Sequence, residues 1–193
     1  MHQALYIIKE EHRALAAVVH GLTFLTAEIE RGAAEPDFPL LQAILSYIRG
    51  FPDRLHHPKE DLYLFKALQR RTNDADGILA ELQADHAAGP LAVDRLEETL
   101  AAYQKQGALA FAPFAQEARA YCDSTFRHMG VEEGKILPLA MQVLTEEDWT
   151  TIDAAFLANN DPMIGIETQK EFRDLFRKIL NLAPAPIGLA DAH

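Results

Sequence analysis

Histidines and glutamates recur in this sequence at spacings that place them together on the faces of helices. His56 and Glu60 are four residues apart, and His128 and Glu132 repeat the same spacing. Residues four apart lie on one side of an α-helix, one turn from each other. Each pair is followed by an acidic residue and then, at the same offset, by two apolar residues. An imidazole and a carboxylate in this arrangement can bind a transition metal ion together.

Two further histidines precede these pairs by similar intervals. His12 lies 44 residues before His56, and His86 lies 42 residues before His128. His12 and His86 each interrupt a stripe of apolar residues spaced alternately by three and four, which indicates a buried helical face. The chain therefore reads as two helical hairpins, each contributing one histidine and then a His-x-x-x-Glu motif.

A lone histidine on an apolar stripe is more often a hydrogen-bonded core residue than a metal ligand. Two glutamates in the same core change that balance, because burying an uncompensated carboxylate is costly. Bound cations would neutralise Glu60 and Glu132 and satisfy the lone pairs of the four imidazoles. These ligand types suit iron, manganese or zinc, and glutamates on two helices can bridge two ions. The sequence predicts a dinuclear metal site.

Long helices must position these residues. The apolar periodicity and the helix-breaking residues predict six helices, over residues 3–31, 38–71, 75–105, 109–143, 146–158 and 166–182. Short connections between four long helices predict an all-α fold, an antiparallel up-down four-helix bundle with two short additional C-terminal helices. We expect one domain over 1–182, with its bundle core at 3–143, peripheral helices at 146–182 and a flexible tail at 183–193.

Polar residues mark two of the helix starts. The stretch 72–74, Thr-Asn-Asp, is expected to cap the third helix. Thr145 and Asp148 have the spacing of a capping box, which predicts the start of the first short helix. The absence of a Glu-x-x-His motif disfavours the ferritin-like di-iron class, which relies on that motif.

Composition excludes several partners. The 193 residues carry a net charge of -11, which disfavours binding to nucleic acid or to an anionic membrane. Cys122 is the one cysteine, so the chain alone forms no disulfide and no thiolate metal site. With no signal peptide or membrane-spanning stretch in the sequence, we expect a cytoplasmic protein. Its oligomeric state stays open, with a homodimer through the short C-terminal helices as one option.

These motifs are similar to those of the hemerythrin-like, or HHE cation-binding, family. The resemblance spans roughly residues 3–143, and its parts are Glu11-His12, His56 to Asp61, Asp85-His86 and His128 to Glu133. It implies an oxo- or hydroxo-bridged di-iron centre that binds or reacts with dioxygen, nitric oxide or peroxide. The ligands that it implies are His12, His56, Glu60, His86, His128 and Glu132, with the two glutamates as bridges.

Two departures from the oxygen-carrying hemerythrins weaken a pure carrier function. Those proteins have a second histidine one turn after the third-helix ligand, where this chain has Pro90. They also use His-x-x-x-x-Asp where this chain has His128 and Glu132. The pattern looks closer to hemerythrin-like proteins linked to iron–sulfur repair and to nitrosative stress. Three functions therefore remain open. The protein reacts with an oxidant, it stores, donates or senses iron without turnover, or it is a metal-free helical interaction protein.

A second pair on the second helix, His57 and Asp61, lies about 100° round the helix from His56 and Glu60. The upstream apolar stripe is out of phase with His56, so we expect prolines at 52 and 58 to kink or re-phase the helix. The repeat favours His56 and Glu60 as ligands, with His57 and Asp61 as additional candidates.

Two positions on the other helices leave alternatives open. His20, two turns after His12, is either a further ligand or a residue that supports the site or the core. Gly89, one turn after His86, either leaves room for a small ligand beside the metal or accommodates a helix distortion caused by Pro90.

Overall fold

The structure is a computed structural model, which describes residues 2–158 together with residues 174, 177 and 179. Its helical elements are α1 (Gln3–Glu30), α2 (Phe38–Phe51), η1 (Pro52–His56), α3 (His57–Lys59), η2 (Glu60–Phe65), α4 (Lys66–Arg71), α5 (Asp76–Gln106), η3 (Gly107–Ala110), α6 (Phe111–Val131), η4 (Glu132–Ile136), α7 (Leu137–Val143) and α8 (Glu146–Leu157). Among the described residues there are helices and turns and no strands.

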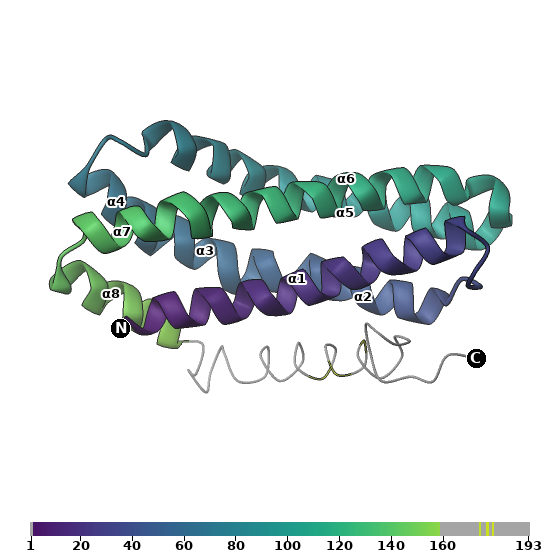
Figure 1. Cartoon of the computed structure of the whole chain (residues 1–193), viewed down its shortest axis with the longest axis horizontal. Coiled ribbons are helices and arrows are strands. Elements are labelled where there is room, and N and C mark those ends of the chain that lie inside the picture. The colour runs from purple at the N-terminus through teal and green to yellow at the C-terminus, as the bar shows by residue number, and fades with distance from the viewer. Residues whose placement is uncertain (1, 159–173, 175–176, 178, 180–193) are drawn as a thin grey trace.

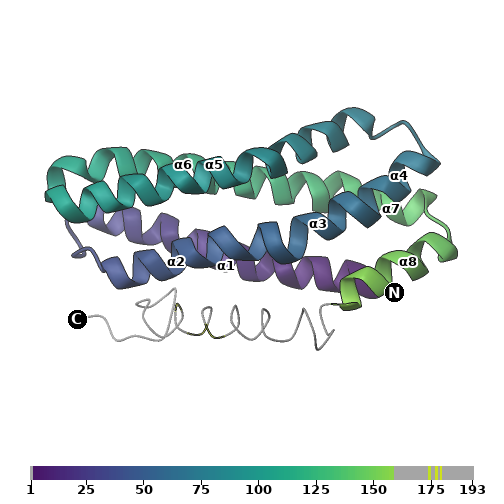
Figure 2. The same cartoon turned by 180° about the vertical axis from the view of Figure 1, so that it is seen from behind.

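Four long rods form the body of the molecule (Figure 1). The first rod is α1, the second runs from α2 to α4, the third is α5, and the fourth runs from α6 to α7. Rods that follow each other in the chain are antiparallel, as the view from behind also shows (Figure 2). The sequence prediction of an all-α, up-and-down four-helix bundle is confirmed.

Glycines end two of these rods, and a capping side chain starts another. Gly32 follows α1 with φ +68° and Gly107 follows α5 with φ +66°, a left-handed conformation that glycine adopts without steric cost. Before α2, the carboxylate of Asp37 accepts a hydrogen bond from the Leu40 amide at 2.9 Å. These stops leave short connections, which force neighbouring rods to pack against each other.

Of the two predicted caps, one is present. Thr145 and Asp148 form the expected capping box at the start of α8, each side chain accepting from the other residue's amide. The predicted cap of the third helix from residues 72–74 is wrong, because the N-cap residue is Ala75 and no side chain bonds there. The Thr72 hydroxyl instead accepts from the Asp74 amide within the preceding turn, at 3.1 Å.

The second rod changes its helical repeat where the histidines begin. In the π-helical turn η1, the His57 amide donates to the carbonyl of Pro52, five residues earlier. The extra residue in this turn moves the buried face forward by one position, so Leu55 and His56 are both buried, at 8% and 1% exposure. The re-phasing expected near Pro52 is therefore present, and it turns His56 toward the bundle axis.

A second and a third π-helical turn follow the two glutamates. Glu60 starts η2 and Glu132 starts η4, where the Leu137 amide donates to the Glu132 carbonyl five residues earlier. In both rods the wider turn buries the apolar pair that follows the motif, Leu64 with Phe65 and Ile136 with Leu137. In a regular α-helix only the first residue of each apolar pair would share the face of the glutamate, so the wider turn brings the second one, Phe65 or Leu137, inward as well.

Two apolar clusters lie on either side of a polar layer within the bundle. On α1, Leu5 and Ile8 belong to one cluster and Leu15 to the other, with His12 between them. On α5, His86 separates the two clusters in the same way. The histidines and glutamates therefore occupy the middle of the bundle, closed off at both ends by packed side chains.

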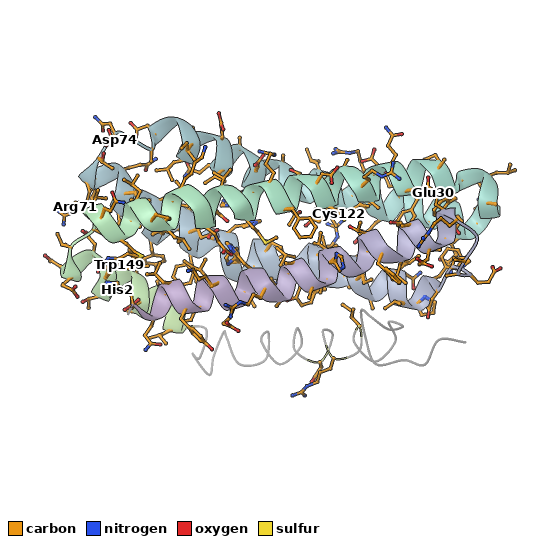
Figure 3. The ribbon with its side chains drawn as sticks, viewed as in Figure 1. His2, Glu30, Arg71, Asp74, Cys122 and Trp149 are labelled. Carbon is orange, nitrogen blue, oxygen red and sulfur yellow. The ribbon has the colours of Figure 1, made fainter. Side chains whose placement is uncertain are left out.

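Helix α8 completes one of these clusters. Its Trp149, Ile152 and Phe156 are buried there, and His2 stacks on Trp149 with ring centroids 4.3 Å apart (Figure 3). The Ala4 amide at the start of α1 donates to Asp153 at 2.7 Å. This short helix therefore closes the end of the bundle. The predicted helix over 166–182, apart from residues 174, 177 and 179, and the tail at 183–193 lie outside the described residues.

Helices long and apolar enough to cross a lipid bilayer do not occur in the part of the chain that the structure describes.

Candidate metal centre

Six side chains from all four rods meet in the polar layer. They are His12 from α1, His56 and Glu60 from the second rod, His86 from α5, and His128 and Glu132 from the fourth rod. None is more than 8% exposed. The structure therefore brings together all six principal residues singled out in the sequence, in a space that water does not reach freely.

The histidines form two close pairs, one from each hairpin. Nε2 of His12 lies 3.0 Å from Nε2 of His56, and Nε2 of His86 lies 3.0 Å from Nε2 of His128. Two nitrogen ligands about 2.1 Å from one ion and at right angles to each other are about 3.0 Å apart. The spacing within each pair therefore suits two neighbouring ligands of one metal ion.

The other ring nitrogen of each histidine contacts a carboxylate from a neighbouring rod. The four Nδ1 contacts are those of His12 with Glu133 at 2.9 Å, His56 with Glu11 at 2.9 Å, His86 with Asp61 at 3.1 Å, and His128 with Asp85 at 3.3 Å. For His56, His86 and His128, the acid comes from the rod that precedes the histidine in the chain. For His12, on the first rod, the acid comes from the fourth rod. The contacts thus close a ring around the bundle.

This ring fixes which nitrogen faces the centre. An ionised carboxylate can only accept a hydrogen bond, so each Nδ1 donates its proton outward. In a neutral imidazole, Nε2 then carries a lone pair that points into the polar layer. Two lone pairs 3.0 Å apart repel each other unless a positive charge lies between them. The geometry of each pair is therefore that of a site for a cation.

Each of the two glutamates faces both histidine pairs. One carboxylate oxygen of Glu60 lies 3.3 Å from Nε2 of His56 and the other lies 3.7 Å from Nε2 of His86. The oxygens of Glu132 likewise lie 3.3 Å from Nε2 of His12 and 3.2 Å from Nε2 of His128. Both carboxylates therefore span the distance between the two pairs, as bridging ligands of two ions would.

The four glutamate oxygens support this interpretation. Glu60 and Glu132 are at most 1% exposed, and none of their carboxylate oxygens has a hydrogen-bond partner among the described residues. Buried oxygens without such partners are uncommon, because their desolvation is not compensated. The residues present thus fit a pair of metal ions, which would supply the missing contacts to these oxygens.

Without metal, the surroundings of His56 and His128 favour bound protons. Burial lowers the pKa of His56, but the charge of Glu60 and the hydrogen bond to Glu11 outweigh it and hold that pKa well above its ordinary value. The pKa of His128 is raised as well, because its contacts with Glu132 outweigh burial. Burial raises the pKa of Glu132, yet His12 and His128 keep it well below the ordinary value. Metal ions and protons therefore compete for these nitrogens.

Comparison with known proteins agrees with this geometry. The sequence profile described as Hemerythrin HHE cation binding domain matches residues 3–140, a range that contains all six central residues and reaches into the last helix of the fourth rod. The chain belongs to this family. No curated protein sequence and no solved structure matches the chain significantly. Membership of this family indicates that the domain binds cations. The structure adds where the donor atoms lie within the hemerythrin domain.

His57, an additional ligand candidate, lies on one side of this hemerythrin centre. It is half-buried, and its ring stacks on that of His86 with centroids 4.0 Å apart and planes 14° from parallel. Its donor nitrogen falls in one potential ligand group with those of His86 and His128, all within 4.8 Å of one another. Each histidine pair also forms a group with Glu60 and Glu132, but among the described residues a third histidine joins the pair of His86 and His128 alone.

Asp61 and His20, the other two additional ligand candidates, do not face the centre of the bundle. Asp61 accepts a hydrogen bond from Nδ1 of His86 and belongs to none of the ligand groups among the described residues. Its side chain orients a histidine, because it is rotated away from the line of Glu60. His20 is exposed, so its expected place in the core or at the metal is wrong. Two turns beyond His12 the helix has rotated this position onto the outer surface.

Sequence reasoning missed the functional importance of three acids in the hydrogen-bonded ring. Glu11, Asp85 and Glu133 orient histidines of neighbouring rods, and none of them was singled out for that role. A signal was present, because each directly flanks a candidate ligand, and Asp61 flanks Glu60 in the same way. Neighbours in a helix point about 100° apart, so such an acid reaches the adjacent rod while the ligand faces the centre.

A cavity of about 220 Å³ reaches the centre from the side of α5 and α6. Its lining includes His56, His57, His86 and His128, and Gly89 forms part of its wall. Helix α5 continues through Pro90 to Gln106. Of the two alternatives for Gly89, the structure thus favours the one in which it leaves open space near the metal ligands.

The thiol of Cys122 belongs to none of the potential ligand groups among the described residues. Cys122, labelled in Figure 3, is 2% exposed and donates a hydrogen bond to the Val19 carbonyl at 3.6 Å. Burial raises the pKa of this thiol to about 11. It is therefore a protonated core residue near neutral pH.

Proposed function

We propose that this hemerythrin domain holds two iron ions and binds or reacts with a small oxidant, such as dioxygen, nitric oxide or a peroxide. In this proposal His12 and His56 bind one ion, His86 and His128 bind the other, and Glu60 and Glu132 bridge them. A role in the response to oxidative or nitrosative stress belongs to the same proposal and rests on the family resemblance.

One observation carries the proposal. The carboxylates of Glu60 and Glu132 are buried between two histidine pairs, with an oxygen directed to each pair and no hydrogen-bond partner for any of the four oxygens among the described residues. A single ion at one pair would leave half of these oxygens uncompensated. Two ions satisfy the whole set, and imidazole with carboxylate is a ligand set that suits iron.

The protein's own residues supply geometry and exclusion of water. When bound, a pair of iron ions supplies reversible electron transfer to or from a small oxidant. Glu11, Asp61, Asp85 and Glu133 hold the four imidazoles in one tautomer and orientation. The two apolar clusters cover the centre on both sides, so the cavity beside His57 is the open approach among the described residues.

The cavity also bears on the alternative function. An iron-storing, iron-donating or iron-sensing module needs a path for the metal, and its function involves no bound oxidant. Apolar atoms form most of the cavity's lining surface, from residues such as Leu15 and Ala92, and the histidines are joined there by polar residues that include Asp85, Arg95 and Glu117. Such a lining favours entry of a small neutral molecule over passage of a hydrated cation. We therefore prefer the oxidant-binding function.

Manganese or zinc would fit the same ligand types, so the metal must be measured. Protein purified without added chelator and then reconstituted with ferrous iron should contain about two iron ions per chain by elemental analysis. Its absorption spectrum should show charge-transfer bands of a bridged di-iron centre that change on addition of peroxide or nitric oxide. Less than half an equivalent of any transition metal after reconstitution would overturn the proposal. Two irons with no spectral response would favour the storage function.

The proposal also places the protein in the cytoplasm, with a small molecule as its ligand. The net charge of -11 supports the expectation that neither nucleic acid nor an anionic membrane is a partner. Cell fractionation followed by immunodetection would test the location directly, and recovery with the membrane fraction would contradict it.

A further inference from the structure

The cavity beside the histidines is larger than a diatomic oxidant requires. Its volume of about 220 Å³ compares with the roughly 10–15 Å³ that a single water molecule needs on the same measure. An apolar cavity of about 150 Å³ is already large enough to hold benzene. Dioxygen, nitric oxide or hydrogen peroxide would therefore fill only a small part of this space.

The walls of the cavity are built from small side chains on two facing rods. Ala88, Gly89 and Ala92 contribute from α5, and Ala120 contributes from α6. Ala92 and Gly89 are half-buried, while Ala88 and Ala120 are exposed and lie toward the opening. Larger residues at these positions would fill the space between the rods, so the sequence itself keeps it open.

Polar side chains line the cavity beside the apolar ones, among them Asp85, Ser124 and Thr125. At the inner end lie the imidazoles, including those of His57 and His86. Elsewhere, Arg95 donates to Glu117 across α5 and α6 at 3.2 Å, and both side chains are partly exposed. The hydroxyl of Thr125 donates to the carbonyl of Tyr121 in its own helix. Because these groups have partners within the protein and most of the lining surface is apolar, the cavity suits a ligand with an apolar body.

We propose that this cavity binds an organic hydroperoxide, with an apolar body about the size of a six-membered ring and its peroxide group at the histidine end. The identity of the head group rests on the proposed function, in which the centre takes a small oxidant. The apolar body follows from the volume and lining of the cavity. The polar head belongs beside His56, His86 and His128, because these are the candidate metal ligands in the lining.

One ligand that is not an oxidant, measured with the unmodified protein and with three variants, tests this inference. The probe is 2-phenyl-2-propanol, the alcohol that corresponds to cumene hydroperoxide, because it has the same apolar body and is not an oxidant. Its binding to the iron-loaded protein is measured by isothermal titration calorimetry, after the iron content of each sample has been determined. We expect one molecule bound per chain.

Ala92→Leu should weaken that binding at least about tenfold, because its side chain occupies the space of the ligand's body. Ala120→Leu tests the opposite wall with the same expectation and serves if the first variant does not fold. Ala80→Leu, an identical change at an exposed position of α5 outside the lining, should leave binding unchanged.

The possible outcomes separate this inference from the proposed function. A protein that fails to hold two irons contradicts the proposed function, whatever it binds in the cavity. A di-iron protein that does not bind the alcohol, or that binds it equally well with leucine at position 92 or 120, overturns the hydroperoxide site and leaves the metal centre standing.

Discussion

Glu11 accepts a hydrogen bond from Nδ1 of His56 at 2.9 Å, while the next residue in the chain, His12, directs Nε2 toward the same histidine. One helical step thus supplies both a candidate ligand and the group that orients its partner on another rod. The same relationship recurs at Asp85 with His128. Orientation of the centre is therefore shared among all four rods, and a change in one acid acts on a histidine elsewhere in the bundle.

Replacing one acid of this ring should weaken metal binding without removing a ligand. In Glu11→Gln we expect the affinity for the metal to fall by about 10- to 100-fold, since the charged acceptor of the His56 proton is lost. The stoichiometry should stay at two ions per chain. Competition with a chelator of known affinity measures the change.

Glu10→Gln is the matched control for this prediction. It changes the same charge on the neighbouring position of α1, where the side chain pairs with Arg13 on the surface. Its metal affinity should equal that of the unmodified protein. An equal loss in both variants would show that net charge, and not the hydrogen bond to His56, is responsible.

The two glutamates are expected to be essential for a dinuclear centre. Glu60→Ala and Glu132→Ala should each abolish binding of two ions, because each removes one oxygen from both metal positions. Native mass spectrometry of the reconstituted variants counts the ions directly. Glu81→Ala, at an exposed position of α5, should keep both ions. If either variant still holds two ions tightly, the assignment of bridging ligands is incorrect.

Much of this arrangement could be predicted because helical periodicity is a strong signal. His12 and His86 occupy positions on regularly spaced apolar stripes, so their burial followed from spacing alone. The capping box at Thr145 could also be predicted, since both of its side chains lie at the start of the helix. Such features depend on residues within one or two turns of each other.

Other features depend on contacts between rods, which sequence spacing does not encode. The positions of the acids in the hydrogen-bonded ring, beside candidate ligands, were visible in the sequence, but their partners were not, because Glu133 reaches His12 across 121 positions of the chain. His57 was ambiguous because a π-helical turn shifts the face of the second rod by one residue. His20 was misplaced because an aromatic side chain near a stripe resembles a core residue until the facing rods are known.

Metal affinity should fall steeply as the solution becomes more acidic. In the metal-free protein the pKa of His56 lies well above its ordinary value and that of His128 is also raised, so binding must displace protons from both. Below those pKa values each displaced proton costs about tenfold in affinity per pH unit. The decline should begin at a higher pH than the ordinary histidine value of about 6.5. Proton release measured by calorimetry in buffers of different ionisation enthalpy checks this, and a count of zero near neutral pH would contradict it.

The stability of the metal-free protein should depend on pH in two opposite ways. The raised pKa of His56 contributes stability that is complete below the unfolded-state pKa of about 6.5 and is lost as pH rises through the folded-state value. The lowered pKa of Glu132 contributes stability that is complete above the unfolded-state pKa of about 4.3 and is lost as pH falls through the folded-state value. Both contributions are therefore complete together only between about pH 4.5 and 6.5.

Urea unfolding of the chelator-treated protein across this range tests that expectation. The free energy of unfolding should be greatest between about pH 4.5 and 6.5 and should decline toward pH 8. The metal-loaded protein should behave differently, because the ions replace the protons and bind more tightly as pH rises. Metal at 100 times its dissociation constant adds about 2.7 kcal/mol, so the two curves should separate most above neutral pH. Parallel curves for the two forms would show that the titration of His56 and Glu132 is not linked to metal binding.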